Sequence, residues 1–152
     1  MLKAKDIMTR DVLTVKEPTT LGELAGILMN NHISGTPVID EKGNLKGIVT
    51  ENDLISQNRR LHIPTILRLF DAFIPLGTSK LENEIKRVSA TTVADIYTKD
   101  VVTVEEETPL ENIATIMAEK KIHHLPVVKE GKLVGIIGKK DIIKGISLEA
   151  SK

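Results

Sequence analysis

The stretch DIMTRDVLTV at residues 6–15 returns later in the chain as DIYTKDVVTV at residues 95–104. The offset between the copies is 89 residues, and after a one-residue deletion opposite Lys42 it becomes 88. Identical pairs continue the match, namely Leu21 and Leu110, Ala25 and Ala114, Ile33 and Ile122, Pro37 and Pro126, Gly47 and Gly135, Ile48 and Ile136, and Asp53 and Asp141. Two copies of one unit usually pack about a pseudo-twofold axis, so we expect any site at their seam to occur twice and to use both copies.

Composition restricts the classes of function. Lys and Arg together number 21, as do Asp and Glu, so the chain has no excess charge to attract nucleic acid or a membrane surface. The absence of Cys excludes disulfides and thiol catalysis, and 2% aromatic residues are too few for base stacking. No apolar stretch has the length of a membrane span or the pattern of a signal peptide, so a cytoplasmic protein is expected.

Each copy predicts a strand, a helix, two strands and a second helix. A β-branched run at residues 12–15 or 101–104 predicts the first strand. Apolar residues then recur at helical spacing in Leu21, Leu24, Ala25 and Leu28, and again in Leu110, Ile113, Ala114 and Met117. Apolar runs around a Gly-containing turn predict hairpins at 37–49 and 126–137, and the second helices begin near Asn52 and Lys140. The expected fold class is α/β (α+β), with two βαββα repeats about a pseudo-twofold axis and a helical insertion between them.

Helix starts and domain boundaries follow from local signals. Thr20 with Glu23, and Thr108 with Glu111 around Pro109, predict capping boxes. We expect a first repeat at 1–56, a helical insertion at 57–93 and a second repeat at 94–152. Within the insertion, Pro64 and Pro75 can bound one helix, and residues 81–88 read as a charged amphipathic helix. This apolar insertion is either a lid on the module's own core or a surface for self-association or a partner.

The strand-to-helix junction around Thr50 and Asp53 has two interpretations. Thr followed three residues later by an acid can simply cap a helix. The same residues can bind a nucleotide, because a helix N-terminus attracts phosphate and a carboxylate can accept hydrogen bonds from two ribose hydroxyls. The second copy keeps the carboxylate as Asp141 but replaces the hydroxyl with Gly138. Ahead of each hairpin lies a patch that differs between the repeats, Ser34-Gly35 in the first and His123-His124 in the second. The two histidines are either phosphate or purine contacts or exposed polar residues. Adjacent residues on a strand point to opposite faces, so the pair is poorly spaced to bind a metal.

The duplicated unit, with its ending Gly-h-h-Thr-x-x-Asp (h apolar), resembles a tandem pair of CBS domains, the repeats named after cystathionine beta-synthase. The resemblance covers about residues 4 to 55 and 94 to 146. It implies two clefts between the repeats that bind adenosine compounds such as AMP, ADP, ATP or S-adenosylmethionine, and modules that often form homodimers. No cofactor is required and no metal site is expected.

The resemblance also implies which residues form each cleft. The favoured cleft would consist of Ile48, Thr50, Asp53, Thr98, Val102, Ile122, His123 and His124. The weaker second cleft would consist of Thr9, Leu13, Ile33, Ser34, Gly35, Ile136, Gly138, Lys139 and Asp141. Asp53 would hold the ribose, with Thr50 and the histidines facing phosphate. Lys139 is the candidate replacement for the missing hydroxyl, and Glu51 near the phosphates favours an AMP-like mononucleotide over ATP.

The leading hypothesis is a non-catalytic regulatory module, an allosteric sensor of an adenine nucleotide. The chain offers no Cys, no arguable Ser-His-Asp set and no dinucleotide-binding glycine turn, so an enzyme is not expected. The alternative is an interaction scaffold with vestigial clefts, which docks an unidentified protein partner or a second copy through the central insertion.

Overall fold

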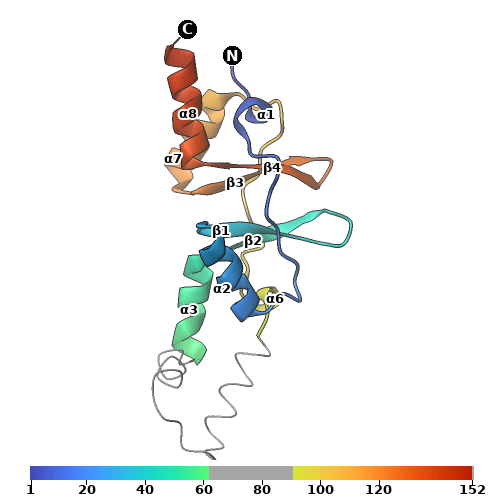
Figure 1. The fold of residues 1–152 in the computed structure, drawn as a ribbon. Coiled ribbons are helices and arrows are strands. Elements are labelled where there is room, and N and C mark those ends of the chain that lie inside the picture. The colour runs from blue at the N-terminus through green and yellow to red at the C-terminus, as the bar shows by residue number, and fades with distance from the viewer. Residues whose placement is uncertain (62–90, 152) are drawn as a thin grey trace, which may run out of the picture. The chain divides into compact units, whose positions relative to one another are not determined.

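The computed structural model describes residues 1–61 and 91–151 of the 152-residue chain. Almost all of the helical insertion expected at 57–93 lies outside the described residues, and so do its two expected helices. The lid and the docking surface therefore stay predictions. Figure 1 shows the described elements along the chain.

The helices and strands follow the expected order in both repeats. In the first repeat they are α1 (Ala4–Ile7), α2 (Leu21–Asn30), β1 (Gly35–Ile39), β2 (Leu45–Thr50) and α3 (Glu51–Leu61). In the second they are α6 (Val93–Ile96), α7 (Leu110–Lys120), β3 (His124–Lys129), β4 (Lys132–Gly138) and α8 (Lys139–Ala150). Both predicted hairpins and all four predicted long helices of the repeats are confirmed.

The first strand of each repeat is shorter than the sequence predicts. In place of strands at 12–15 and 101–104, single parallel bridges join Val15 to Val38 and Val104 to Val127. A turn begins directly after each bridge, because Thr19 N donates to Lys16 O at 3.0 Å and Thr108 N donates to Glu105 O at 3.1 Å. Pairing therefore stops after one residue, and each named sheet of the described chain has two strands, β1 with β2 and β3 with β4.

One of the two predicted capping boxes is wrong. Thr20 caps α2 as expected, since Glu23 N donates to its hydroxyl and Thr20 N donates to the Glu23 carboxylate. The helix α7 begins one residue later than predicted, at Leu110, and Pro109 occupies its N-cap without a side-chain hydrogen bond. The Thr108 hydroxyl instead accepts a hydrogen bond from Glu105 N at 3.1 Å, so it closes the preceding turn.

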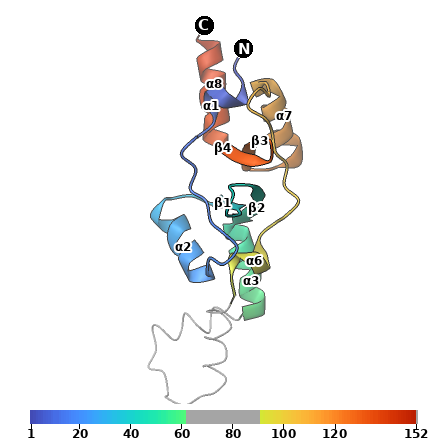
Figure 2. The same ribbon diagram turned by 90° about the vertical axis from the view of Figure 1, so that its right-hand side faces the viewer.

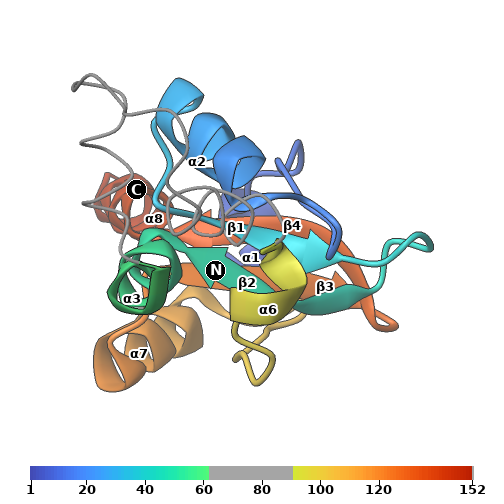
Figure 3. The same cartoon turned by 90° about the horizontal axis from the view of Figure 1, so that it is seen from below.

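The described chain divides into two compact units that exchange segments between the repeats. Unit 1 comprises Met1–Thr14, Ile39–Gly47 and Lys99–Lys152, and unit 2 comprises Val15–Val38 and Ile48–Thr98. In unit 1, α1 of the first repeat packs on α8 and β4 of the second (Figure 2). In unit 2, α6 of the second repeat packs on α3, and α2 packs on α3 (Figure 3). Each repeat thus supplies the short opening helix of the other repeat's unit.

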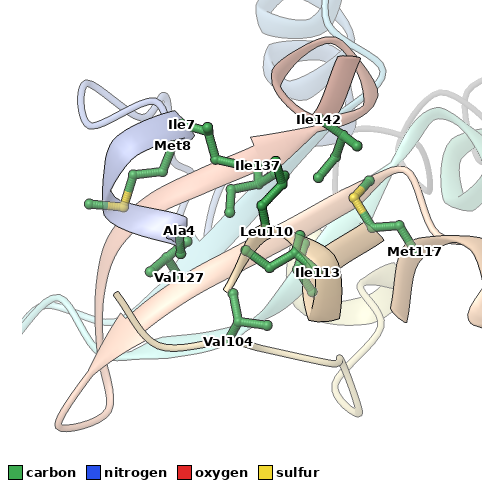
Figure 4. Close-up of a cluster of buried hydrophobic side chains, with 11 residues drawn as sticks. Ala4, Ile7, Met8, Val104, Leu110, Ile113, Met117, Val127, Ile137 and Ile142 are labelled. Carbon is green, nitrogen blue, oxygen red and sulfur yellow. The ribbon is translucent and has the colours of Figure 1, made fainter. Parts of the chain in front are cut away.

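Each unit has its own hydrophobic core. The core of unit 1 joins α1, α7, β3, β4 and α8 through the residues drawn in Figure 4, with Ile113, Leu125, Val127 and Ile137 fully buried. The core of unit 2 consists of Val15, Leu24, Leu28, Val38, Val49, Val93 and Tyr97. Burial of this apolar surface holds the exchanged helices α1 and α6 in place.

Candidate functional site

The first candidate site is the β2–α3 junction, residues 50–53 of unit 2. Asp53 Oδ2 accepts hydrogen bonds from Thr50 N at 2.8 Å and Thr50 Oγ1 at 3.3 Å, and Asp53 N donates to Thr50 Oγ1 at 3.4 Å. The predicted helix cap is therefore present. Both residues are half-buried, and Asp53 Oδ1 accepts no hydrogen bond from the described residues. The cap thus engages only one of the two carboxylate oxygens of Asp53.

Two further segments of unit 2 lie beside this junction. Ile48 and Thr98 form an antiparallel bridge, with Ile48 N donating to Thr98 O at 3.0 Å and Thr98 N donating to Ile48 O at 2.8 Å. Glu51 N donates to Ser34 O at 2.9 Å, which fixes the start of β1 against the start of α3. The structure therefore brings together the unit 2 members of the favoured set: Ile48, Thr50, Asp53 and Thr98.

The second candidate site is the β4–α8 junction, residues 138–141 of unit 1. Gly138 N donates to Asp141 Oδ2 at 2.8 Å, as Thr50 N does to Asp53, but the hydroxyl half of the cap is missing. Thr9 and Ile136 repeat the bridge of Thr98 and Ile48, with hydrogen bonds of 2.9 and 3.0 Å. The two junctions therefore share one backbone frame and differ in their side chains.

The glycine at position 138 is not required by the backbone. Its φ of −111° and ψ of 178° are extended, a conformation that any residue adopts. A Cβ atom there would meet its nearest neighbours, His123 O and Asp141 Oδ2, at 3.8 and 3.9 Å, which is ordinary van der Waals contact. Position 138 therefore has room for a Cβ atom.

The predicted cleft residues are divided between the two units. Unit 1 holds Val102, Ile122, His123 and His124 of the favoured set, and unit 2 holds the other four. For the second set, unit 2 holds Ile33, Ser34 and Gly35, and unit 1 holds Thr9, Leu13, Ile136, Gly138, Lys139 and Asp141. Within unit 1, the strand pairing places His124 opposite Gly138. The combination of residues from both units into clefts stays a prediction.

Sequence reasoning did not foresee two features of these junctions. One is the contact from Glu51 N to Ser34 O, which links a variable patch to the junction of the same unit. The other is that Asp53 uses only Oδ2 in the helix cap, while its Oδ1 accepts no hydrogen bond from the described residues. Only the similar spacing in the two repeats, 16 residues from Ser34 to Thr50 (50 − 34) and 15 from His123 to Gly138 (138 − 123), signals that the patch and the junction meet across a hairpin.

Two other features, a metal-binding cluster and a membrane-spanning helix, are absent from the ranges that the structure describes. No group of three or more His, Asp or Glu residues is placed there to hold a metal ion. No helix among the described residues is long and apolar enough to cross a membrane.

Comparison with known proteins identifies the repeats. A family model described as the CBS domain matches residues 4–59 and again residues 93–148. The chain belongs to the CBS domain family. The predicted tandem CBS pair and its fold class are therefore confirmed, whereas the boundaries 1–56, 57–93 and 94–152 stay a prediction.

Relatives and solved structures agree with this assignment. The protein MJ1426 of Methanocaldococcus jannaschii is 31% identical over 153 residues, which cover 93% of this chain and 89% of that protein. A crystal structure of CBSX2 in complex with AMP is similar with a TM-score of 0.76 and 25% identity, and the match covers 100% of each chain. The CBS domain pair of MJ0100, in complex with 5′-methylthioadenosine and S-adenosyl-L-methionine, matches with a TM-score of 0.71, 25% identity and 98% of each chain.

Proposed function

We propose that this CBS-domain chain is a non-catalytic regulatory module that binds an adenosine nucleotide, with AMP favoured, in clefts formed by its two repeats. One observation carries the proposal: Asp53 is fixed by its cap to Thr50 while its Oδ1 has no partner among the described residues. A fixed, half-exposed carboxylate oxygen is the acceptor that ribose hydroxyls need. Two structural neighbours, CBSX2 and the MJ0100 pair, bind adenosine compounds and support this choice of ligand.

The preference for a mononucleotide follows from charge. Glu51 is exposed at the first position of α3, beside the junction that we assign to the ligand. Each further phosphate would add negative charge near this carboxylate and near Asp53. AMP is therefore the favoured ligand of the Asp53 junction. We also propose that the module acts in the cytoplasm as a homodimer, in which ligand binding changes the preferred arrangement of the repeats.

The test uses a substitution that separates the cap from the ligand site. In Asp53→Asn the amide oxygen keeps the cap to Thr50, and an NH₂ donor replaces the open acceptor. We expect AMP affinity, measured by isothermal titration calorimetry, to fall more than tenfold while the thermal midpoint changes little. Asp95→Asn is the matched control. Asp95 Oδ2 accepts a hydrogen bond from Thr92 N at 3.0 Å in the same unit, and Asp95 is not a proposed ligand residue. Equal AMP affinity in wild type and Asp53→Asn contradicts the site.

The interaction scaffold is the second candidate function. Exposed isoleucines on α3 and α8 favour it, with Ile55 63% and Ile143 67% exposed. Thermal-shift measurements with AMP, ADP, ATP and S-adenosylmethionine separate the two functions. Stabilisation by any of these ligands supports the sensor, because a ligand that binds only the folded state raises the midpoint. A flat response to all four supports the scaffold.

A further inference from the structure

The outward face of α8 has an apolar centre. Ile143 and Ile146 are three residues apart, so they lie on one side of the helix, and they are 67% and 54% exposed. The opposite side of α8 packs into unit 1, because a Cβ atom at Gly145 would lie 3.1 Å from Leu110 and 3.2 Å from Ile7. The fold therefore uses one side of α8 and leaves the isoleucine side exposed.

Two lysines border the apolar centre. Lys140 and Lys144 are four residues apart on the same side of α8, and both are exposed. Neither forms an ion pair with a residue that the structure describes, whereas Lys3 and Lys5 are both paired with Glu107. Like charges at this spacing destabilise a helix slightly, so folding gains nothing from them. The face therefore fits a partner surface that is apolar and brings a carboxylate.

The duplicated helix α3 keeps the apolar centre and changes the charge around it. Ile55 is the counterpart of Ile143 at an offset of 88 residues, and it is 63% exposed. The counterparts of the two lysines are Asn52 and Ser56, both exposed and uncharged. Glu51, one turn before Ile55, is the exposed charged side chain among those that the structure describes on α3. This second face is therefore apolar, has no lysine and carries a carboxylate.

Charge distinguishes the three ways in which two copies of the chain can bring these faces together. Contact of α8 with α8 would gather the lysines of both copies around the isoleucines, and contact of α3 with α3 would bring two Glu51 carboxylates together. Contact of α3 with α8 places the carboxylate of one copy near the lysines of the other. Because like charges disfavour an interface and opposite charges favour it, the mixed contact is the one that the two faces fit.

We propose that two copies of this chain associate head to tail, with the Ile55 face of α3 in one copy against the Ile143 face of α8 in the other. The inference rests on the homodimer in the proposed function and adds which faces meet. In a twofold dimer such a contact occurs twice, since each copy supplies both helices. Each chain then buries both isoleucine faces, and no unmatched apolar face is left to extend the assembly.

Single cysteines test the pairing in the full chain, which has no Cys of its own. Ser56→Cys marks the α3 face, and Ser147→Cys, one turn after Ile143, marks the α8 face; both serines are exposed. After subunit exchange, we expect a short bis-maleimide to cross-link the mixed variants about fivefold more than either variant alone, because the two helices meet only between copies. Met29→Cys mixed with Ser147→Cys is the control, since Met29 is 76% exposed on α2.

The cross-linking pattern identifies the faces that meet. A higher yield from Ser147→Cys alone would place α8 against α8, and a higher yield from Ser56→Cys alone would place α3 against α3. Either result overturns the head-to-tail contact, and so does a mixed yield no greater than that of the Met29→Cys control.

Charge reversal is the second measurement. The double variant Lys140→Glu with Lys144→Glu is expected to raise the dimer dissociation constant about tenfold, because its carboxylates meet Glu51 of the other copy. Adding Glu51→Lys is expected to restore most of the affinity, which a contact of α8 with α8 does not explain. Sedimentation equilibrium without nucleotide measures the constants, and circular dichroism melts show that each variant is folded. A triple variant that associates as weakly as the double variant contradicts the proposal.

The outcomes separate this inference from nucleotide binding. A wild-type chain that stays monomeric but binds AMP in calorimetry overturns the head-to-tail contact and the homodimer, and leaves the Asp53 site intact. A chain that cross-links as expected but binds no adenosine compound supports the contact and contradicts the proposed ligand.

Discussion

At the scale of the residue, the structure requires glycine at only one of two positions in β4, Gly135 and Gly138. A Cβ atom at Gly135 would lie 2.5 Å from Met8 Sδ and 3.1 Å from Thr9 O. The methionine side chain can move, but Thr9 O is backbone held by the hydrogen bond from Ile136 N at 3.0 Å. Gly138 has room for a Cβ atom and an extended backbone. Close approach thus requires the first glycine, whereas neither close contact nor backbone conformation requires the second.

Alanine at each position tests this difference. We expect Gly135→Ala to lower the free energy of unfolding by about 1–3 kcal/mol, because overpacking must displace the Thr9 segment. We expect Gly138→Ala to be neutral or to stabilise by up to about 1 kcal/mol, because alanine restricts the unfolded chain without strain in the fold. Urea denaturation of both variants measures these values. An equal loss in the two variants is evidence against the contact of Gly135 with Thr9.

At the scale of the element, the sequence predicted helices and hairpins because their signals are local. The spacing of Leu21, Leu24 and Leu28 and the turn around Gly43 each depend on neighbouring residues only. Two features were not predictable in this way. The Thr108 hydroxyl can cap a helix or close a turn, and the pattern does not choose between them. The helix α1 has four residues, too few for periodicity, so its packing on α8 and β4 appears only in three dimensions.

An ion-pair cluster ties the exchanged N-terminal segment to unit 1. Lys3 Nζ and Lys5 Nζ lie 2.6 and 2.7 Å from the two carboxylate oxygens of Glu107, just before α7. Hydrogen bonds from Lys3 and Lys5 lower the pKa of Glu107 from 4.5 to about 2. A lowered acid pKa stabilises the fold above the unfolded-state value, and this contribution is lost as the pH falls from about 4.5 to about 2.

The pH dependence of Glu107→Gln tests the cluster. We expect the variant to melt below wild type at pH 7, by a small margin because both partners are largely exposed. The difference is expected to shrink to almost nothing as the pH falls to 2, where folded wild-type Glu107 is about half protonated and the unfolded chain's Glu107 is neutral. Scanning calorimetry between pH 2 and 7 measures it, with Glu105→Gln as the control outside the pairs. A difference that persists unchanged at pH 2 would show that packing, not charge, accounts for the loss.

At the scale of the whole molecule, the duplication predicted the architecture but not the exchange of segments. The sequence repeats run from Asp6 and Asp95, whereas each compact unit takes its opening helix from the other repeat. A repeat boundary marks where similarity begins, and a unit boundary marks where packing density falls, so the two need not coincide. The cap between Thr50 and Asp53 was predictable from motif spacing, whereas the two clefts were expected only from the family resemblance and stay a prediction.

The duplication also repeats one exposed apolar position, which bears on the assembly of two chains. Ile55 on α3 and Ile143 on α8 are 88 residues apart and 63% and 67% exposed, and Ile146, one turn after Ile143, is 54% exposed. Such side chains are typical of interfaces, so we expect homodimers that bury the Ile143 face of α8. The double variant Ile143→Ser with Ile146→Ser is expected to weaken dimerisation at least tenfold, as loss of two buried anchors does. Sedimentation equilibrium measures the dissociation constant. Met29→Ser, on the 76% exposed Met29 of α2, is the control, and an unchanged constant in the α8 variant would place the dimer contact on another surface.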